Sequence, residues 1–183
     1  MSTATLTENT TFAVDASHSR VGFTVRHLGF SKIRGSFETF EGTIRMDGND
    51  LSTLAVEAVA QTASVTTNEP KRDEHLRSGD FFLVEEYPTM TFKSTEVRSV
   101  EGNSFTLVGD LTIRGVSKQV EFLAEFLGSG NDPWGNLKVA FEATTTINRK
   151  EFGLNWNAAL EAGGFVVSDD VAIELEVQAA PQG

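Results

Sequence analysis

Apolar and mostly polar residues alternate with a period of two along most of the 183-residue chain. On an extended strand, this pattern places apolar side chains on one face and polar side chains on the other. Glycine, asparagine and aspartate residues separate the alternating segments. The segments expected to form strands are 21–26, 36–46, 54–61, 89–93, 104–114, 120–126, 138–147 and 171–177. About eight strands at hairpin-like spacing predict an all-β fold, either an antiparallel sandwich or a closed barrel.

The segment 68–79 lacks this alternation and carries the signals of one short helix between two strands. Asn68 is a suitable capping residue, Pro70 suits the first turn, and Gly79 suits the end of the last turn. We therefore expect a short helix that crosses between neighbouring strands.

No linker, repeat or shift in composition marks a second domain. We expect a flexible N-terminal segment over residues 1–11, a barrel over 12–179 and a tail over 180–183. Residues 1–11 lack the basic and apolar regions of a secretion signal, so a cytoplasmic location is expected. No apolar run approaches the ~20 residues that span a bilayer, so stable membrane insertion is not expected.

The chain is strongly acidic, with 15 Lys and Arg against 26 Asp and Glu and a formal net charge of −11. Nucleic-acid backbones and anionic membrane faces attract clustered cations, so this balance argues against either partner. The absence of cysteine excludes disulfides, thiolate catalysis and iron–sulfur clusters.

The three histidines, His18, His27 and His75, are the obvious candidates for catalysis or metal binding. Their spacing matches no metal-binding motif, so no metal site is expected. Ser17 precedes His18 outside any nucleophile elbow, and neighbouring side chains on an extended chain point apart. We therefore expect that the protein is not an enzyme. The alternative, an enzyme acting on a small apolar substrate, would need His18 or His75 beside a carboxylate inside a cavity.

Two polar segments each allow two interpretations. The expected helix is either a solvated, self-paired surface or a lid that directs Arg72 and His75 toward the mouth of a cavity. The segment 148–157 is either a packed corner or a rim where an arginine faces an anionic or carbonyl group. The candidates for contact with a polar ligand head are His18, Arg72, His75, Arg149 and Trp156.

The aromatic content is uneven, with 14 Phe against 2 Trp and 1 Tyr. Phe brings apolar area without a hydrogen-bonding tip, so it suits a dry interior. The interior of an eight-stranded barrel either fills with side chains or holds one small ligand, and Ala58, Ala60, Ala124 and Ala143 on the same faces leave volume. We therefore expect an apolar cavity lined by Phe23, Val25, Phe40, Phe92, Leu111, Phe122 and Phe141.

Five groups of residues, in order along the chain, carry a family likeness: DASHS at 15–19, RDEHLRS at 72–78, GDLTIRGV at 109–116, TTINRKEFG at 145–153 and DDV at 169–171. Together they resemble the YceI-like family of polyisoprenoid-binding, lipocalin-like proteins. The resemblance implies an eight-stranded antiparallel barrel that holds a polyprenyl chain, a quinone or a fatty-acyl tail in its lumen.

The expected function is storage or transport of an isoprenoid-type lipid, such as a polyprenyl chain or an isoprenoid quinone, with no other cofactor. An exposed strand edge or the mouth of the barrel would suit a homodimer. Besides an enzyme, the alternative is a ligand-free stress-accessory or interaction protein, whose barrel would be filled with side chains.

Overall fold

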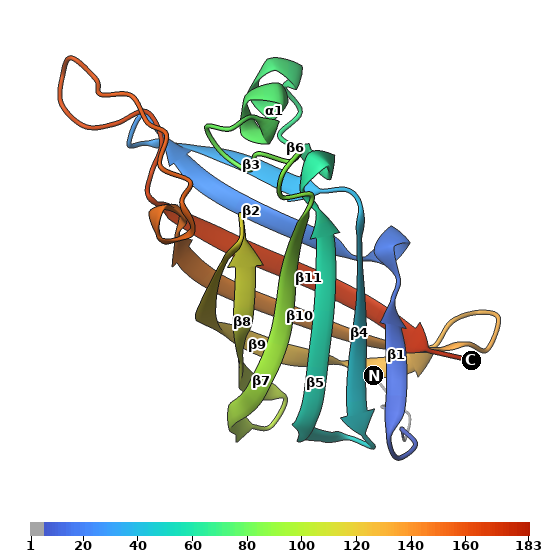
Figure 1. The fold of residues 1–183 in the computed structure, drawn as a ribbon. Coiled ribbons are helices and arrows are strands. Elements are labelled where there is room, and N and C mark those ends of the chain that lie inside the picture. Colours follow the sequence, from blue (N-terminus) through green and yellow to red (C-terminus); the bar gives the residue numbers. More distant parts are fainter. Residues whose placement is uncertain (1–5) are drawn as a thin grey trace.

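The computed structural model describes residues 6–183, most of which lie in antiparallel strands (Figure 1). The strands are β1 (Thr10–Val14), β2 (Arg20–His27), β3 (Ser31–Phe37), β4 (Phe40–Asp47), β5 (Asp50–Gln61), β6 (Val65–Thr66), β7 (Thr89–Glu101), β8 (Ser104–Ile113), β9 (Val116–Asn131), β10 (Leu137–Asn148) and β11 (Asp170–Pro181). One helix, α1 (Pro70–Arg77), and three 3-10 turns, η1 (Ala16–His18), η2 (Thr62–Ser64) and η3 (Arg149–Phe152), complete the described elements.

Eight strands form a closed ring in the order β1-β4-β5-β7-β8-β9-β10-β11, which closes where Phe12 of β1 lies opposite Pro181 of β11. Strands β2, β3 and β6 extend the wall at one end, because β2 pairs with β11 beyond the part that β1 occupies. The pairs β1–β2, β3–β4 and β5–β6 are therefore each one long strand interrupted by a bend. The predicted eight-stranded antiparallel barrel is confirmed.

The bends explain why some strand boundaries differ from the prediction. The expected strand 36–46 crosses the break between β3 and β4 at residues 38–39. At the β5–β6 break, Thr62 is buried, its N–H donates to the Pro88 carbonyl at 2.9 Å, and its hydroxyl donates to the Tyr87 carbonyl at 2.8 Å. These bonds join residues far apart in sequence, so a local pattern does not reveal them.

The ordered barrel also extends further at both ends than the expected range 12–179. Residues 1–5 of the expected flexible segment lie outside the described residues, but Leu6 is buried and β1 already begins at Thr10. At the other end, β11 continues to Pro181. Both extensions follow from closure of the ring, because β1 and the end of β11 pair with each other.

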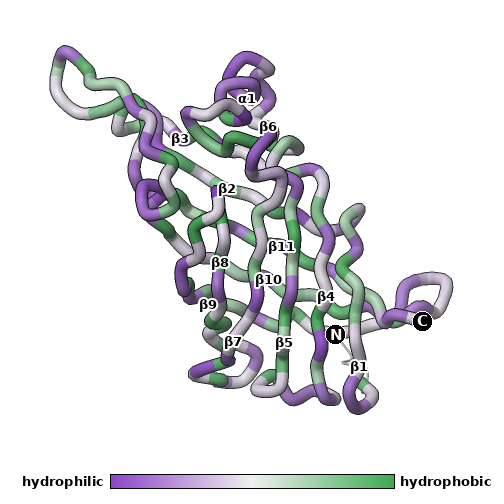
Figure 2. Tube along the Cα trace, viewed as in Figure 1, coloured by the Kyte–Doolittle hydropathy of each residue, from purple (hydrophilic) through white to green (hydrophobic). Residues whose placement is uncertain are grey.

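Apolar and polar residues alternate along the strands (Figure 2), and the apolar side chains form the core as expected. On β9, the side chains of Val120, Phe122, Ala124 and Phe126 are buried, whereas the glutamates between them are exposed. Leu123 is an exception, because it lies on the outer face with 69% of its surface exposed.

Phenylalanine rings fill the barrel between its walls. The rings of Phe92 and Phe122 are 5.3 Å apart, and those of Phe126 and Phe141 are 5.1 Å apart. A Cβ at Gly109 would lie 2.6 Å from the Phe92 ring, so glycine is required for this close packing. This part of the interior is therefore packed with protein side chains.

Helix α1 lies at the end of the barrel that β2, β3 and β6 extend (Figure 1). Its capping residue is Glu69 rather than the expected Asn68: the Glu69 carboxylate accepts from the Arg72 N–H at 2.7 Å, whereas Asn68 adopts a positive φ of 62°. The last helical residue is Arg77, and Ser78 rather than Gly79 is the C-cap. Asp73 is buried and accepts from the N–H and the hydroxyl of Thr67 at 2.8 and 2.6 Å, which attaches the helix to the chain that follows β6.

Candidate ligand-binding cavity at the helix-capped end

A cavity of about 420 Å³ lies beneath α1, between the extended wall and the segments that follow α1 and β10. Its wall consists mainly of inward-facing residues of β2, β3 and β11, with Met90 of β7, Ile113 of β8 and Ile147 of β10, together with residues from the helix and from two loops. The lining residues used below are Val21, Phe23, Val25, Ile33, Phe37, Val171 and Ile173 from the strands, and Arg72, His75, Phe81, Phe82, Arg149, Trp156 and Val166 from the helix and loops.

The strand wall of the cavity is apolar because β2 and β11 alternate strictly. The side chains of Val21, Phe23 and Val25 share one face of β2, and Ile173 lies opposite Phe23 on β11. The Phe23 ring lies over Gly35 of β3, where a Cβ would be only 2.3 Å from the ring. This close approach keeps the large ring against the wall rather than across the cavity.

Arg149 forms a polar corner in this apolar cavity. Its side chain is only 4% exposed; Nε donates to the Ser168 carbonyl at 2.8 Å, and Nη1 donates to the Trp156 carbonyl at 2.9 Å. Within residues 6–183, Nη2 has no hydrogen-bond partner, and Asp169 Oδ1 lies 3.7 Å away. Burial lowers the pKa of Arg149, and the charge of Asp169 opposes that shift. One buried guanidinium nitrogen therefore remains able to donate to an acceptor atom on a ligand.

An aromatic cluster borders this corner. The His75 ring lies 4.6 Å from the Trp156 ring and 5.1 Å from the Phe81 ring, both edge to face. His75 Nε2 is 2.8 Å from Asp80 Oδ2, which fixes the orientation of the imidazole. The guanidinium carbon of Arg149 lies 6.0 Å from the centre of the Phe81 ring. The cluster therefore places flat aromatic surfaces beside the buried cation.

The structure brings together half of the residues expected to contact a ligand. Arg72 and His75 come from α1, and Arg149 and Trp156 come from the segment after β10. Arg72 also has a structural role, because its Nε and Nη2 donate to Thr67 at 2.6 and 2.9 Å. The expected residues that line the cavity are Phe23, Val25, Arg72, His75, Arg149 and Trp156.

The other expected residues do not line this cavity. His18 lies on η1 with a largely exposed side chain. Leu111, Phe122 and Phe141 are buried in the core, and Phe40 and Phe92 are half-buried against it. The rings of Phe92 and Phe122, and those of Phe126 and Phe141, contact one another in the barrel interior, so these residues belong to the packed core and not to the cavity wall.

Several residues that line the cavity were not predicted from the sequence. Ile33, Phe37 and Ile173 lie on inward strand faces, so their alternation with polar neighbours was the available signal. Phe82 lies just after the helix, and Val166 lies in a loop without periodicity. Both residues line the cavity only because the chain folds back to it, so no local sequence pattern predicts them.

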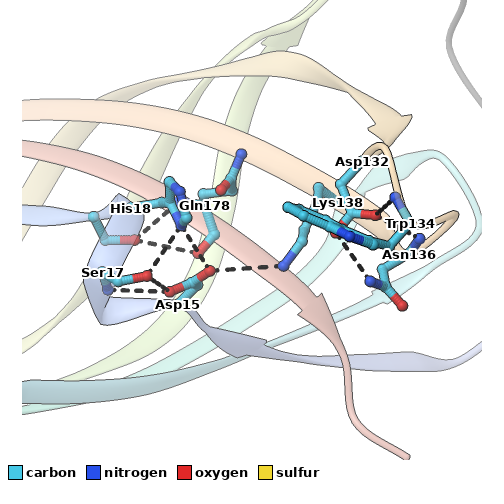
Figure 3. A network of polar contacts seen from close by, with 9 residues as sticks. Asp15, Ser17, His18, Asp132, Trp134, Asn136, Lys138 and Gln178 are labelled. Carbon is cyan, nitrogen blue, oxygen red and sulfur yellow. Dashed lines mark hydrogen bonds and ion pairs between the residues drawn. The ribbon is translucent and has the colours of Figure 1, made fainter.

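Outside the cavity, Asp15, Ser17 and His18 form a polar cluster (Figure 3). The Ser17 hydroxyl donates to Asp15 Oδ1 at 2.6 Å, and both Ser17 Oγ and Asp15 Oδ2 lie 3.0 Å from His18 Nδ1. The hydrogen bond from Ser17, followed by that from His18, holds the pKa of Asp15 well below its ordinary value. The expectation that Ser17 and His18 point apart is wrong, because η1 coils this segment. In a hydrolytic triad the acid and the nucleophile contact opposite nitrogens of the imidazole, whereas here both contact Nδ1.

Two other kinds of feature are absent from residues 6–183. No group of three or more His, Asp or Glu side chains in this range is arranged to hold a metal ion. No helix in the same range has the length and apolar character needed to cross a membrane.

A closed antiparallel barrel with an apolar cavity at one end is a β-barrel of the lipocalin-like class. The family model for the YceI-like domain matches residues 12–179, and the chain belongs to this family. The family resemblance predicted from the sequence is thus confirmed.

Relatives and solved structures agree with this assignment. A UPF0312 protein of Staphylococcus aureus is 40% identical over 170 residues, which cover 92% of this chain and 96% of the relative. A Campylobacter jejuni YceI protein shares the fold with a TM-score of 0.72 and 28% identity, covering 86% of this chain and 90% of that chain.

Two more distant structures show the same fold. BcnA of Burkholderia cenocepacia has a TM-score of 0.78 at 21% identity and covers 90% of this chain and 98% of its own. A polyisoprenoid binding domain from Saccharophagus degradans has a TM-score of 0.68 at 14% identity and covers 93% of this chain and 98% of its own.

Proposed function

We propose that the protein binds a long apolar molecule of the isoprenoid type in the cavity beneath α1, for storage or transport. The observation that carries this proposal is an apolar cavity of about 420 Å³ whose buried polar corner retains an unused hydrogen-bond donor. A cavity of this volume lies within the range of known small-molecule sites, about 300–1,000 Å³. The Saccharophagus degradans domain of the same fold is described as polyisoprenoid binding, which agrees with the proposal by analogy of fold.

The cavity volume sets the size of the buried part of the ligand. A dry apolar cavity of about 150 Å³ holds one benzene molecule, which has six carbons. By this measure, 420 Å³ accommodates about 17 carbon atoms, or between three and four isoprene units. The remainder of a longer chain would extend through the mouth, because the ring contacts of Phe92 with Phe122 and of Phe126 with Phe141 occupy the barrel interior on the other side.

Arg149 defines the chemistry of the ligand head. Its Nη2 is buried and lacks a hydrogen bond, with only the ion pair to Asp169 at 3.7 Å, so an oxygen acceptor on the ligand would satisfy this donor. A quinone carbonyl, a carboxylate or a phosphate each supplies such an oxygen, and the anionic groups would gain additional strength from the guanidinium charge. The adjacent rings of His75, Phe81 and Trp156 offer flat surfaces on which a planar head can stack.

Solvent extraction of the purified protein, followed by mass spectrometry of the extract, tests the proposal. The wild-type protein is expected to release a long-chain apolar molecule in a stoichiometric amount. The Val25→Asp variant, which places a charge on the cavity wall, should release almost none. Leu123→Asp is the matched control, because Leu123 is 69% exposed on the outer face of β9, and it should retain the ligand.

A second variant separates loss of binding from loss of folding. Ile173→Trp keeps the wall apolar but fills the cavity, so it should reduce the ligand content of a folded protein, with folding checked by circular dichroism. Repeated empty extracts from the wild-type protein, or full retention by both cavity variants, would contradict the proposal. Empty extracts would instead favour a ligand-free interaction protein.

A further inference from the structure

Two exposed phenylalanine side chains, Phe30 and Phe165, form apolar tips at the rim of the cavity. Phe30 follows the turn between β2 and β3 and is 74% exposed, and Phe165 lies in the long loop before β11 and is 58% exposed. The two segments are joined, because the Leu28 N–H donates to the Val166 carbonyl at 2.9 Å. In Figure 1, the loop before β11 lies beside the turn between β2 and β3. His27 and Val166 from these two segments line the cavity, so the segments that carry the exposed rings also form its rim.

Exposed cations surround the base of the Phe30 tip. Arg26, Lys32 and Arg34 share the outer face of the β2–β3 hairpin, where Arg26 pairs in register with Lys32. None of the three forms an ion pair within the described residues. Asp170 and Glu174 of β11 line the same surface depression as these three cations.

The β2–β3 hairpin therefore differs in charge from the rest of the chain. Residues 20–37 contain four Lys and Arg and no Asp or Glu, although the whole chain has a net charge of −11. The net charge argued against an anionic membrane face as a partner, but it averages over surfaces that point in different directions. An approaching anionic surface responds first to the charges that face it within about 10 Å at moderate salt.

The turn itself carries an apolar residue in a strained position. Leu28 and Gly29 have φ values of 55° and 80°, which is the geometry of a type I′ hairpin turn. Asparagine is the favoured residue at the first of these positions, and leucine there is disfavoured by its Cβ. A strained leucine beside an exposed phenylalanine indicates that the apolar character of the tip has a use.

We infer that the surface formed by Leu28, Phe30 and Phe165, with Arg26, Lys32 and Arg34 behind it, docks onto an anionic lipid bilayer. This surface is called the docking face below. The rings would enter the headgroup region, and the cations would contact lipid phosphates, as in other interfacial anchors. A symmetric dimer through the same face would instead place like cations near each other, which is unfavourable.

The position of the docking face has a consequence for exchange of ligand. If the proposed function holds, a chain would pass between the bilayer and the cavity without crossing open water, because the face lies at the cavity rim. Bilayer docking itself is independent of any bound ligand, so it is tested separately.

Flotation with lipid vesicles is the direct test. The ligand-free protein is mixed with vesicles of phosphatidylcholine alone, or of phosphatidylcholine with phosphatidylglycerol. Binding is expected only to the vesicles with phosphatidylglycerol, and it should fall when salt is raised from about 0.01 M to about 1 M, which shortens the screening length from ~30 to ~3 Å. Each cation near an anionic surface raises partitioning by about fivefold, so Lys32→Gln should lower it by that factor.

The aromatic tips are tested by a double variant, Phe30→Ser with Phe165→Ser. Withdrawing one such ring from water strengthens binding by about tenfold or more. Because the double variant removes two rings, it should bind about a hundredfold more weakly. Trp134→Ser is the matched control. Trp134 is 83% exposed at the β9–β10 turn, separated from the cavity by the length of β10, about 40 Å for its 12 residues. Arg45→Gln, an exposed cation on β4, is the control for Lys32→Gln.

Several results would overturn the inference. The protein could fail to float with either kind of vesicle, or bind both kinds equally. Binding could also fall equally in the Phe30→Ser, Phe165→Ser double variant and in the Trp134→Ser control. A dimer in solution that the tip variant converts to monomer, without vesicle binding by the wild-type protein, would identify the docking face as an interface between two copies.

Discussion

The volume of the cavity predicts how affinity depends on the length of the ligand chain. Burial of one methylene group contributes about 0.8 kcal/mol, so each additional carbon should tighten binding about fourfold while the cavity has room. The cavity of about 420 Å³ has room for about 17 carbons. Affinity should therefore rise steeply through the shorter alcohols and then level off near this length.

The assay is competition against a fluorescent apolar probe, with linear and isoprenoid alcohols of increasing length and delipidated protein. Ile173→Trp reduces the volume of the cavity, so the length at which affinity levels off should decrease. Leu123→Trp adds the same ring on the outer face and should leave the curve unchanged. The reasoning is refuted if affinity does not depend on chain length, if it keeps rising well beyond about 20 carbons, or if both variants shift the curve equally.

Two further predictions concern the framework around the cavity. Asp73→Ala should lower the free energy of unfolding by about 3 kcal/mol, because the Thr67 N–H and hydroxyl lose a buried charged acceptor. Urea denaturation beside Glu74→Ala, an exposed position on the same helix, measures this, and equal losses would contradict it. Because the folded-state pKa of Asp15 lies below its ordinary value of 3.8, ionised Asp15 stabilises the fold above that pH, and this stabilisation is lost as the pH falls further. The Tm difference between the wild-type protein and Ser17→Ala should therefore be largest at neutral pH and shrink below pH 3.8; a constant difference would refute the role of the Ser17 hydrogen bond.

Local signals were sufficient for the strands and the helix. The side-chain alternation on β9 and β11 depends only on the period of an extended chain, so it was visible without any partner strand. The helix was likewise visible from Pro70 and the absence of alternation, although its cap was assigned one residue too early. Strand β6 has only two residues, which is too short for a periodic signal.

The polar corner shows the limit of such signals. The sequence predicts Arg149 as a rim residue, but its burial and its unused nitrogen depend on the carbonyls of Trp156 and Ser168, which lie 12 residues apart in the loop between η3 and β11. The sequence also predicts that Ser17 and His18 point apart on an extended chain, but the short turn η1 brings Ser17 Oγ within 3.0 Å of His18 Nδ1.

The sequence by itself determined an eight-stranded antiparallel barrel with an apolar interior, because the alternation of side chains and the family motifs are properties of the linear chain. It did not determine which inward residues enclose space and which fill it. Phe23 and Phe122 follow the same alternation, yet Phe23 lies over Gly35 at the cavity wall and Phe122 packs against Phe92 in the core. Only the tertiary structure decides this, because empty volume arises from how rings on non-adjacent strands meet. Likewise, the excess of cations over residues 20–37 is visible in the sequence, but only the pairing of β2 with β3 places Arg26 beside Lys32 on one outer face.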